Sequence, residues 1–229
     1  MRWTSAFGWV ALVACVLGGC ASLSRHPSTP VVSAPAAGAG ANAGSIEQYA
    51  ALIKANSELS DHEPDAKARA ELATRSLSAA DACLALNAQA AACQYGKAVA
   101  TGMEARVHPT KAVGLINSML QDLSAAESAD PNYDRAGPSR VRALVLLRAP
   151  GWPLGPGDAD AGLAAARKAV SLQPDYPANV LALAEALSKT GDGKGARDSY
   201  QHALELAQAM PAGPETSEWI RAAQDGLAR

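Results

Sequence analysis

The sequence predicts an all-α fold in which helical hairpins stack into a continuous array. Apolar residues recur at steps of three and four through most of residues 45–229, which is the period of an amphipathic helix. Aromatic residues make up 4% of the chain, so the core must consist mainly of Leu, Val and Ala, which favours close helix packing over a β-sandwich. Two similar junctions, at residues 130–133 and 173–176, lie 43 residues apart and indicate a repeat.

The clearest hairpin spans residues 177–206. Gly191-Asp192 separates two short amphipathic segments, with Gly suited to the end of the first helix and Asp to a cap or turn. Larger apolar residues fall at helical spacing, and small residues stand where the two helices would approach most closely. They are Leu183, Leu187, Tyr200 and Leu204, and Ala184, Ala186, Ala196 and Ala203. One such hairpin cannot bury both apolar stripes alone, so it needs stacked neighbours.

These residues resemble a tetratricopeptide repeat (TPR), whose pattern combines small residues at close-packing positions, a Gly-Asp turn, and a Tyr or Phe followed by Ala in the second helix. The residues that match in register are Leu183, Ala184, Gly191, Asp192, Ala196, Tyr200, Ala203 and Leu204. The family's usual proline after the second helix is absent, because Gln208 stands there and Pro211 comes later. The resemblance implies a helical-repeat solenoid that binds other proteins.

Earlier hairpins are expected from the same periodicity. The first would pair residues 46–59, for which Ser45 is a candidate N-cap, with residues 64–87. The second would pair residues 90–107 with residues 109–129. Inward-facing positions in these hairpins are expected at Ile46, Tyr49, Ala50, Ile53, Leu59, Leu72, Leu77, Ala80, Leu84, Ala85, Val113, Ile116, Leu120 and Leu123.

The third hairpin would begin near Pro138 and resume after a Gly157-Asp158 turn, with Gly162 at a close-packing position. We therefore expect about four hairpins. Residues 215–227 would close the array as a capping helix, with Trp219 packed inward.

An unusually long connection separates the two helices of the third hairpin. Residues 149–157 (APGWPLGPG) contain three prolines and three glycines, whereas a tight repeat turn needs only a few residues. Under one interpretation, Trp152 and Leu154 in this loop form part of a binding surface. Under the other, Trp152 folds back to cap a hydrophobic gap.

The N-terminal segment has features of a signal that directs a protein to the membrane. Residues 6–17 are apolar but too short to span a bilayer comfortably. They lead into Leu17-Gly18-Gly19-Cys20, which resembles a bacterial lipobox and implies removal of residues 1–19 and lipidation of Cys20. The alternatives are an ordinary secretory signal cleaved nearby or a chance cysteine. Because no Asp follows the cysteine, the resemblance implies a lipid anchor on the periplasmic side of the outer membrane.

A tether is expected between Cys20 and the helical array. Residues 24–44 are rich in Pro, Ala, Gly and Ser and nearly uncharged, a composition that cannot bury enough apolar surface to fold. The expected organisation is therefore a signal peptide over 1–19, a lipidated tether over 20–44 and a TPR-like domain over 45–229.

Two cysteines, Cys83 and Cys93, remain once Cys15 is removed and Cys20 is acylated. In an oxidising compartment, two cysteines on either side of a predicted turn favour a structural disulfide. The alternative is a redox-active pair, but the spacing is not CxxC and no thioredoxin-like strand pattern surrounds it.

Sequence fragments that mimic catalytic or metal-binding motifs fail on inspection. Residues 191–195 hint at a phosphate loop, but no strand precedes them and Gly195 replaces the required Ser or Thr. Residues 158–169 lack the glycine and the final glutamate of a calcium loop, so Asp158 or Asp160 reads better as a helix cap. We therefore expect no enzyme, cofactor or metal.

A net charge of −2 makes nucleic acid an improbable partner.

The function that the sequence favours is that of a lipid-anchored scaffold that binds proteins in the cell envelope. The runner-up is an accessory component of a TRAP-type solute transporter, which the chain resembles in layout and which would dock a solute-binding protein and allow a small-molecule ligand. A cell-envelope assembly or peptidoglycan-associated adaptor is a further alternative.

Overall fold

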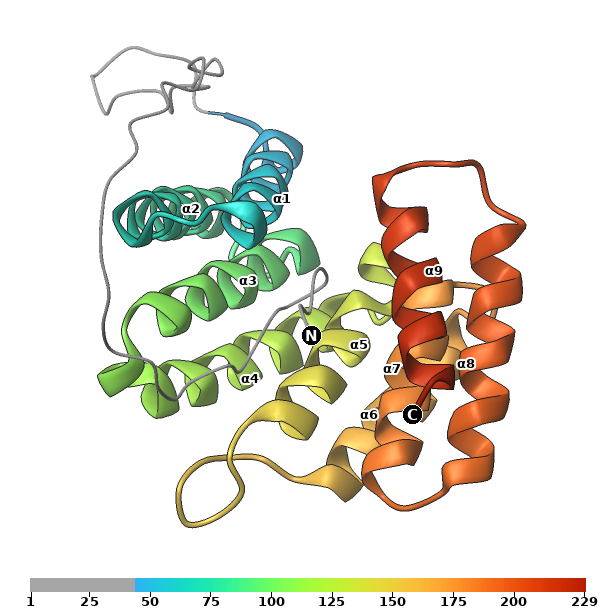
Figure 1. The fold of residues 1–229 in the computed structure, drawn as a ribbon. Helices are drawn as coiled ribbons and strands as arrows, with labels where there is room; N and C mark the ends of the chain where they lie inside the picture. Colours follow the sequence, from blue (N-terminus) through green and yellow to red (C-terminus); the bar gives the residue numbers. More distant parts are fainter. Residues whose placement is uncertain (1–43) are drawn as a thin grey trace, which may run out of the picture.

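The computed structural model describes residues 44–229, and this part of the chain is all-α, as predicted (Figure 1). Its elements are α1 (Ile46–His62), α2 (Ala66–Leu86), α3 (Ala91–Val107), the 3-10 turn η1 (Pro109–Lys111), α4 (Ala112–Ala129), α5 (Tyr133–Arg148), α6 (Ala159–Leu172), α7 (Pro177–Lys189), α8 (Gly193–Gln208) and α9 (Pro214–Leu227). The expected signal peptide, the lipidation site Cys20 and the tether up to residue 43 lie outside the described residues. No helix within residues 44–229 is both long and apolar enough to cross a bilayer.

The helices form four hairpins, α1–α2, α3–α4, α5–α6 and α7–α8, and α9 packs on the last one. Each hairpin also contacts the next through α2 and α3, α4 and α5, or α6 and α7. The odd-numbered helices contact one another in series along the array, whereas the even-numbered helices of the described region do not. The odd-numbered helices therefore make an inner layer and the even-numbered helices an outer layer (Figure 1). The predicted four hairpins and closing helix are confirmed.

Helix ends follow the predicted capping residues. Ser45 begins α1 with a capping box, in which its side chain and that of Gln48 bond each other's backbone N–H groups. Asp158 accepts the N–H of Ala161 and begins α6. Asp192 caps α8 in the same way, and Gly191 before it has φ +89°, a conformation that suits glycine. Both Gly-Asp turns are thus where the sequence placed them.

The core consists largely of alanine and leucine. The small residues predicted at the close approach of α7 and α8 are buried, and Leu187 and Tyr200 pack among them. Gly162 also lies at a close contact, because a Cβ there would come within 2.8 Å of the Leu147 side chain. Trp219 is 6% exposed, so its predicted inward packing is confirmed.

Three apolar positions expected to face inward are instead exposed: Leu59, Ala85 and Val113. Leu59 and Ala85 lie in the last turns of α1 and α2, and Val113 lies in the first turn of α4. Packed helices cross at an angle, so an apolar stripe that is buried in the middle of a helix loses contact with the neighbouring helix near the helix ends.

Cys83 near the end of α2 and Cys93 near the start of α3 form a disulfide, with both residues fully buried. The bond covalently joins the first two hairpins. It lies beside the core that α1, α2 and α3 share, which includes Ile53, Leu72 and Met103.

Candidate functional site

A group of aromatic and charged residues gathers on the inner layer, and we call it the inner cluster. Its members come from α3, α5 and α9 and from the residue that precedes α7. They are Tyr95, Tyr133, Asp134, Arg135, Arg140, Tyr176 and Trp219.

Asp134 connects the two halves of the cluster. One of its carboxylate oxygens accepts a hydrogen bond from the hydroxyl of Tyr95 at 3.0 Å and another from Nη2 of Arg140 at 2.8 Å. Gly137 makes this contact possible, because a Cβ there would lie 2.7 Å from the Asp134 carboxylate and 3.0 Å from the Tyr95 hydroxyl. The ring of Tyr133 packs edge-on against Tyr95, with 5.4 Å between the ring centroids.

The first turn of α5 has an unusual backbone. Asp134, Arg135 and Ala136 all have positive φ values, between 48° and 62°, where side chains other than glycine are strained. Buried Arg140 donates from Nη1 to the carbonyl oxygens of Asp134 and Arg135 and to Oδ1 of Asn179. Asn179 in turn donates to the Arg135 carbonyl at 3.1 Å. These bonds hold the strained turn and thereby fix where Asp134 and Arg135 are presented.

Asn179 also ties α5 to its neighbours. Fully buried on α7, it donates to the carbonyl oxygens of Ala169 and Gln173 at the end of α6. A buried polar side chain with its hydrogen bonds satisfied specifies one arrangement of the surrounding helices.

Tyr176 is the centre of the aromatic half. The guanidinium carbon of Arg135 lies 4.9 Å from the centroid of its ring, and that of Arg140 lies 5.1 Å from it. Trp219 packs edge-on against the same ring, with a centroid separation of 5.2 Å. Arg135 is exposed, so the cluster offers solvent a cation resting on an aromatic face.

Burial raises the pKa of Tyr95 and of Tyr176 above the usual tyrosine value. For Tyr95 the charge of Asp134 acts in the same direction, whereas for Tyr176 the cation of Arg140 opposes the effect of burial. Both phenols are therefore neutral hydrogen-bonding groups near pH 7. Among the described residues, no group of three or more His, Cys, Asp and Glu side chains is arranged to hold a metal ion.

The two ends of the array meet beside this cluster. Nζ of Lys54 on α1 lies 3.2 Å from Glu215 on α9, and Nε2 of His62 on α1 lies 3.8 Å from Glu218 on α9. The inner layer thus curves until its first and last helices come within side-chain reach, and the cluster lies on the inner-layer side from α3 to α9.

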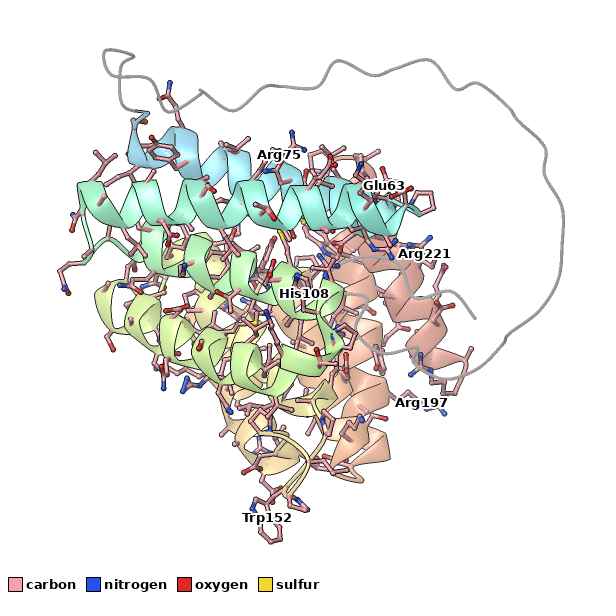
Figure 2. All side chains as sticks on the ribbon, turned by 90° about the vertical axis from the view of Figure 1, so that its left-hand side faces the viewer. Glu63, Arg75, His108, Trp152, Arg197 and Arg221 are labelled. Atoms are coloured by element: carbon pink, nitrogen blue, oxygen red, sulfur yellow. A yellow bond between two sulfur atoms is a disulfide. The ribbon has the colours of Figure 1, made fainter. Side chains whose placement is uncertain are left out.

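The binding residues that the sequence suggested, Trp152 and Leu154, lie elsewhere. Their loop follows the last turn of α5, whereas the inner cluster begins at the first turn, roughly 20 Å away along a 16-residue helix. Trp152 is 90% exposed and projects from the molecule, so it does not cover a hydrophobic gap (Figure 2). A binding role for the two residues stays a prediction.

Sequence reasoning did not single out the members of the inner cluster, apart from Trp219. One signal was present: Tyr133 and Tyr176 occupy the same place in the two similar junctions that lie 43 residues apart. The repeat therefore brings two tyrosines to equivalent positions at the starts of α5 and α7. Arg140 and Asn179 carry no comparable signal.

Comparisons with known proteins support the fold. Neither a protein-family model nor a curated protein matches the sequence. Among solved structures, the chain is similar to a thermophilic TPR protein from Thermus thermophilus, with a TM-score of 0.54 and 21% sequence identity. The match covers 80% of this chain and 93% of that protein. With its stacked hairpins and its inner and outer layers, the described part of the chain therefore has a TPR-like fold.

Proposed function

We propose that this protein is a lipid-anchored scaffold of the bacterial cell envelope, which uses its inner cluster to bind a segment of a partner protein. The anchor would be Cys20, at the periplasmic face of the outer membrane, and residues 20–44 would be the lipidated tether. The sequence supports this location through its lipobox-like segment. The TPR-like fold supports binding to proteins.

The observation that carries the proposal is the placement of Arg135 and Tyr176. An exposed guanidinium lies on a half-buried aromatic ring, and the side chains beneath are held by hydrogen bonds. Aromatic residues and arginine are enriched among the residues that dominate binding energy at protein interfaces. Because Arg140 and Asn179 fix the turn that carries Arg135, little backbone freedom at this turn remains to be lost on binding.

A comparison of baits tests this function. Residues 21–229 are immobilised, exposed to periplasmic and membrane extract from the host, and the bound proteins are identified by mass spectrometry. The same experiment is done with Arg135→Glu, which replaces the exposed guanidinium that lies on the ring of Tyr176 with a carboxylate. The matched control is Lys194→Glu, which reverses an exposed charge on the outer helix α8.

We expect a partner that the wild-type chain and the Lys194 variant recover equally and that the Arg135 variant recovers much less. The purified partner should then bind the wild-type chain and the Lys194 variant with similar affinity and the Arg135 variant more weakly. Equal recovery by all three baits would contradict binding through the inner cluster, and recovery of no protein above background would contradict the scaffold function itself.

A further inference from the structure

The loop between α5 and α6 presents an apolar tip, which we define as residues 152–154 (Trp-Pro-Leu). Trp152 is 90% exposed and Leu154 is 73% exposed, the two highest values among the exposed large apolar side chains of the described region. The remaining exposed large apolar residues, Leu59, Leu86 and Val113, lie on α1, α2 and α4. The tip therefore protrudes alone, without an apolar surface around it (Figure 2).

The base of the loop is closed by backbone contacts. Gly151 and Gly157 form a bridge, Gly157 donates to the carbonyl oxygen of Pro150 at 2.8 Å, and Asp158 donates to that of Leu146 at 2.9 Å. These bonds hold the tip at the end of α5. The tip is therefore exposed on a loop whose backbone is held by hydrogen bonds.

Glycines are required inside this loop because the backbone folds closely on itself. A Cβ at Gly155 would lie 2.7 Å from the carbonyl oxygen of Pro150, and a Cβ at Gly157 would collide with the carbonyl group of Ala149. The N–H groups of Leu154, within the tip, and of Gly155, next to it, both donate to the carbonyl oxygen of Gly151.

The tip has no charged side chain and few N–H groups that would lose contact with water. Residues 149–157 carry no charged side chain, and their three prolines have no N–H group. Of the other N–H groups, those of Leu154, Gly155 and Gly157 are already satisfied within the loop. Few N–H groups would therefore lose hydrogen bonds to water if the tip entered an apolar medium.

These features fit the interfacial zone of a lipid bilayer better than a pocket in a protein. Tryptophan is enriched at membrane interfaces, where its ring is apolar and its N–H remains near water. A binding hot spot between proteins is surrounded by side chains that exclude water, and no such surround is present on α5 or α6. Insertion into a bilayer, in contrast, requires only a protruding apolar tip and no surrounding side chains.

The position of the tip is compatible with an anchor at Cys20. The described chain begins just before α1, which lies opposite the loop between α5 and α6 in Figure 1 and opposite Trp152 in Figure 2. Twenty-three residues separate Cys20 from Gly44 and extend to at most about 80 Å, while a compact domain of this size is roughly 40 Å across. The chain between anchor and domain is therefore long enough to pass around the domain to the same bilayer.

We propose that Trp152 and Leu154 insert into the interface of a lipid bilayer and hold the domain against the membrane in a fixed orientation. This contact goes beyond the proposed scaffold function and uses residues outside the inner cluster. A tip with two apolar side chains binds weakly by itself, but an anchor in the same chain raises its effective concentration at the membrane to the millimolar range.

Tryptophan fluorescence tests the insertion directly. Residues 21–229 contain only Trp152 and Trp219, so Trp219→Phe leaves Trp152 as the reporter. This protein is titrated with phosphatidylcholine vesicles, with and without bromine on the acyl chains. Wild-type residues 21–229 and a Trp152→Ser variant are compared in vesicle flotation, which does not depend on the Trp219 substitution. Because these proteins lack Cys20 and the tip binds weakly without the anchor, flotation is done at millimolar lipid. Leu59→Ser, at another exposed apolar site, is the matched control.

We expect vesicles to shift the emission of Trp152 to shorter wavelengths and the brominated lipids to quench it. The shift should persist at high salt because the tip is uncharged, and adding Leu154→Ser should reduce it. Flotation should be lost in Trp152→Ser and unchanged in Leu59→Ser. It should also be unchanged in Arg135→Glu, which separates this contact from the scaffold function.

Two results would overturn the proposal. One is an emission spectrum and flotation that vesicles do not change at any lipid concentration. The other is burial of Trp152 by a purified protein partner under conditions in which vesicles leave it exposed, which would make the tip a protein contact.

Discussion

The ammonium group of Lys54 lies 3.2 Å from a carboxylate oxygen of Glu215, and this ion pair joins the first helix of the array to the last across 161 residues of sequence. The helices themselves are not packed, because α1 and α9 meet through long side chains. The inner layer therefore closes by an exposed polar contact. Such a contact can open without disturbing a hydrophobic core.

The Lys54–Glu215 pair should contribute little to stability. Both side chains are more than half exposed, and exposed ion pairs contribute about 0–1 kcal/mol. A double-mutant cycle with Lys54→Ala and Glu215→Ala, measured by urea unfolding, should give a coupling energy below about 1 kcal/mol. A coupling of several kcal/mol would mean that the two ends of the array are locked together.

Gly137→Ala should destabilise the protein, because the new methyl group would collide with the Asp134 carboxylate and the Tyr95 hydroxyl. Overpacking of this kind costs about 1–3 kcal/mol. Gly114→Ala on α4 is the matched control, since nothing lies within 4 Å of a Cβ there. In an open helix position the same substitution should stabilise by up to about 1 kcal/mol. Urea midpoints that move in the same direction for both variants would contradict the tight packing at Gly137.

The fold was predictable because local signals and tertiary packing agree. The Gly191-Asp192 turn, the Asp158 cap and the alanines between α7 and α8 each require only residues close in sequence. Prediction failed for Leu59, Ala85 and Val113, which have the correct helical spacing but lie in terminal turns. Periodicity indicates which face of a helix is apolar, but it does not indicate where along the helix the neighbour ends.

The inner cluster was much harder to predict. Its geometry depends on three successive residues in the left-handed region, none of which is glycine, so the sequence does not predict that conformation. Arg140 and Asn179, which hold that turn, are 39 residues apart in sequence and meet only after the third and fourth hairpins pack. The two equivalent tyrosines were visible in the sequence, but the two arginines that lie against the ring of Tyr176 were not.

Stability should decrease in alkaline solution because of buried tyrosines. Burial raises the pKa of Tyr95, Tyr133, Tyr176 and Tyr200 above the usual value of 10.0. A tyrosine with a raised folded-state pKa contributes stability that is fully present below pH 10 and is lost as the pH rises through the folded-state pKa.

Tyr95→Phe provides the measurement. The unfolding free energies of the wild-type protein and of Tyr95→Phe are compared below and above pH 10. The variant lacks the hydrogen bond to Asp134 and starts from a lower stability, but its unfolding free energy should decrease less as the pH rises. Parallel pH profiles would show that Tyr95 ionises equally well in the folded and unfolded chain.

Removing the Cys83–Cys93 bond should lower the free energy of unfolding by roughly 3 kcal/mol, since the bond closes a loop between residues 10 apart in the unfolded chain. The test compares residues 21–229 with the Cys83→Ser/Cys93→Ser variant in urea. Thiols are also counted in unreduced, denatured protein, because both residues are buried in the folded state. No thiol is expected there. Two reactive thiols would exclude the bond.

Cys20→Ala should release the protein from the membrane. The proposed anchor depends on acylation of this one side chain, and several acyl chains hold a protein far more firmly than two apolar residues at a loop tip. In cell fractionation, the wild-type chain should remain with the outer membrane and the variant should appear in the soluble periplasm. Trp152→Ser in the lipidated chain is the control, because loss of the tip should change the orientation of the domain but leave it in the membrane fraction. Retention of Cys20→Ala in the membrane would refute the lipid anchor, and if Trp152→Ser then released it, the tip would be the principal membrane contact.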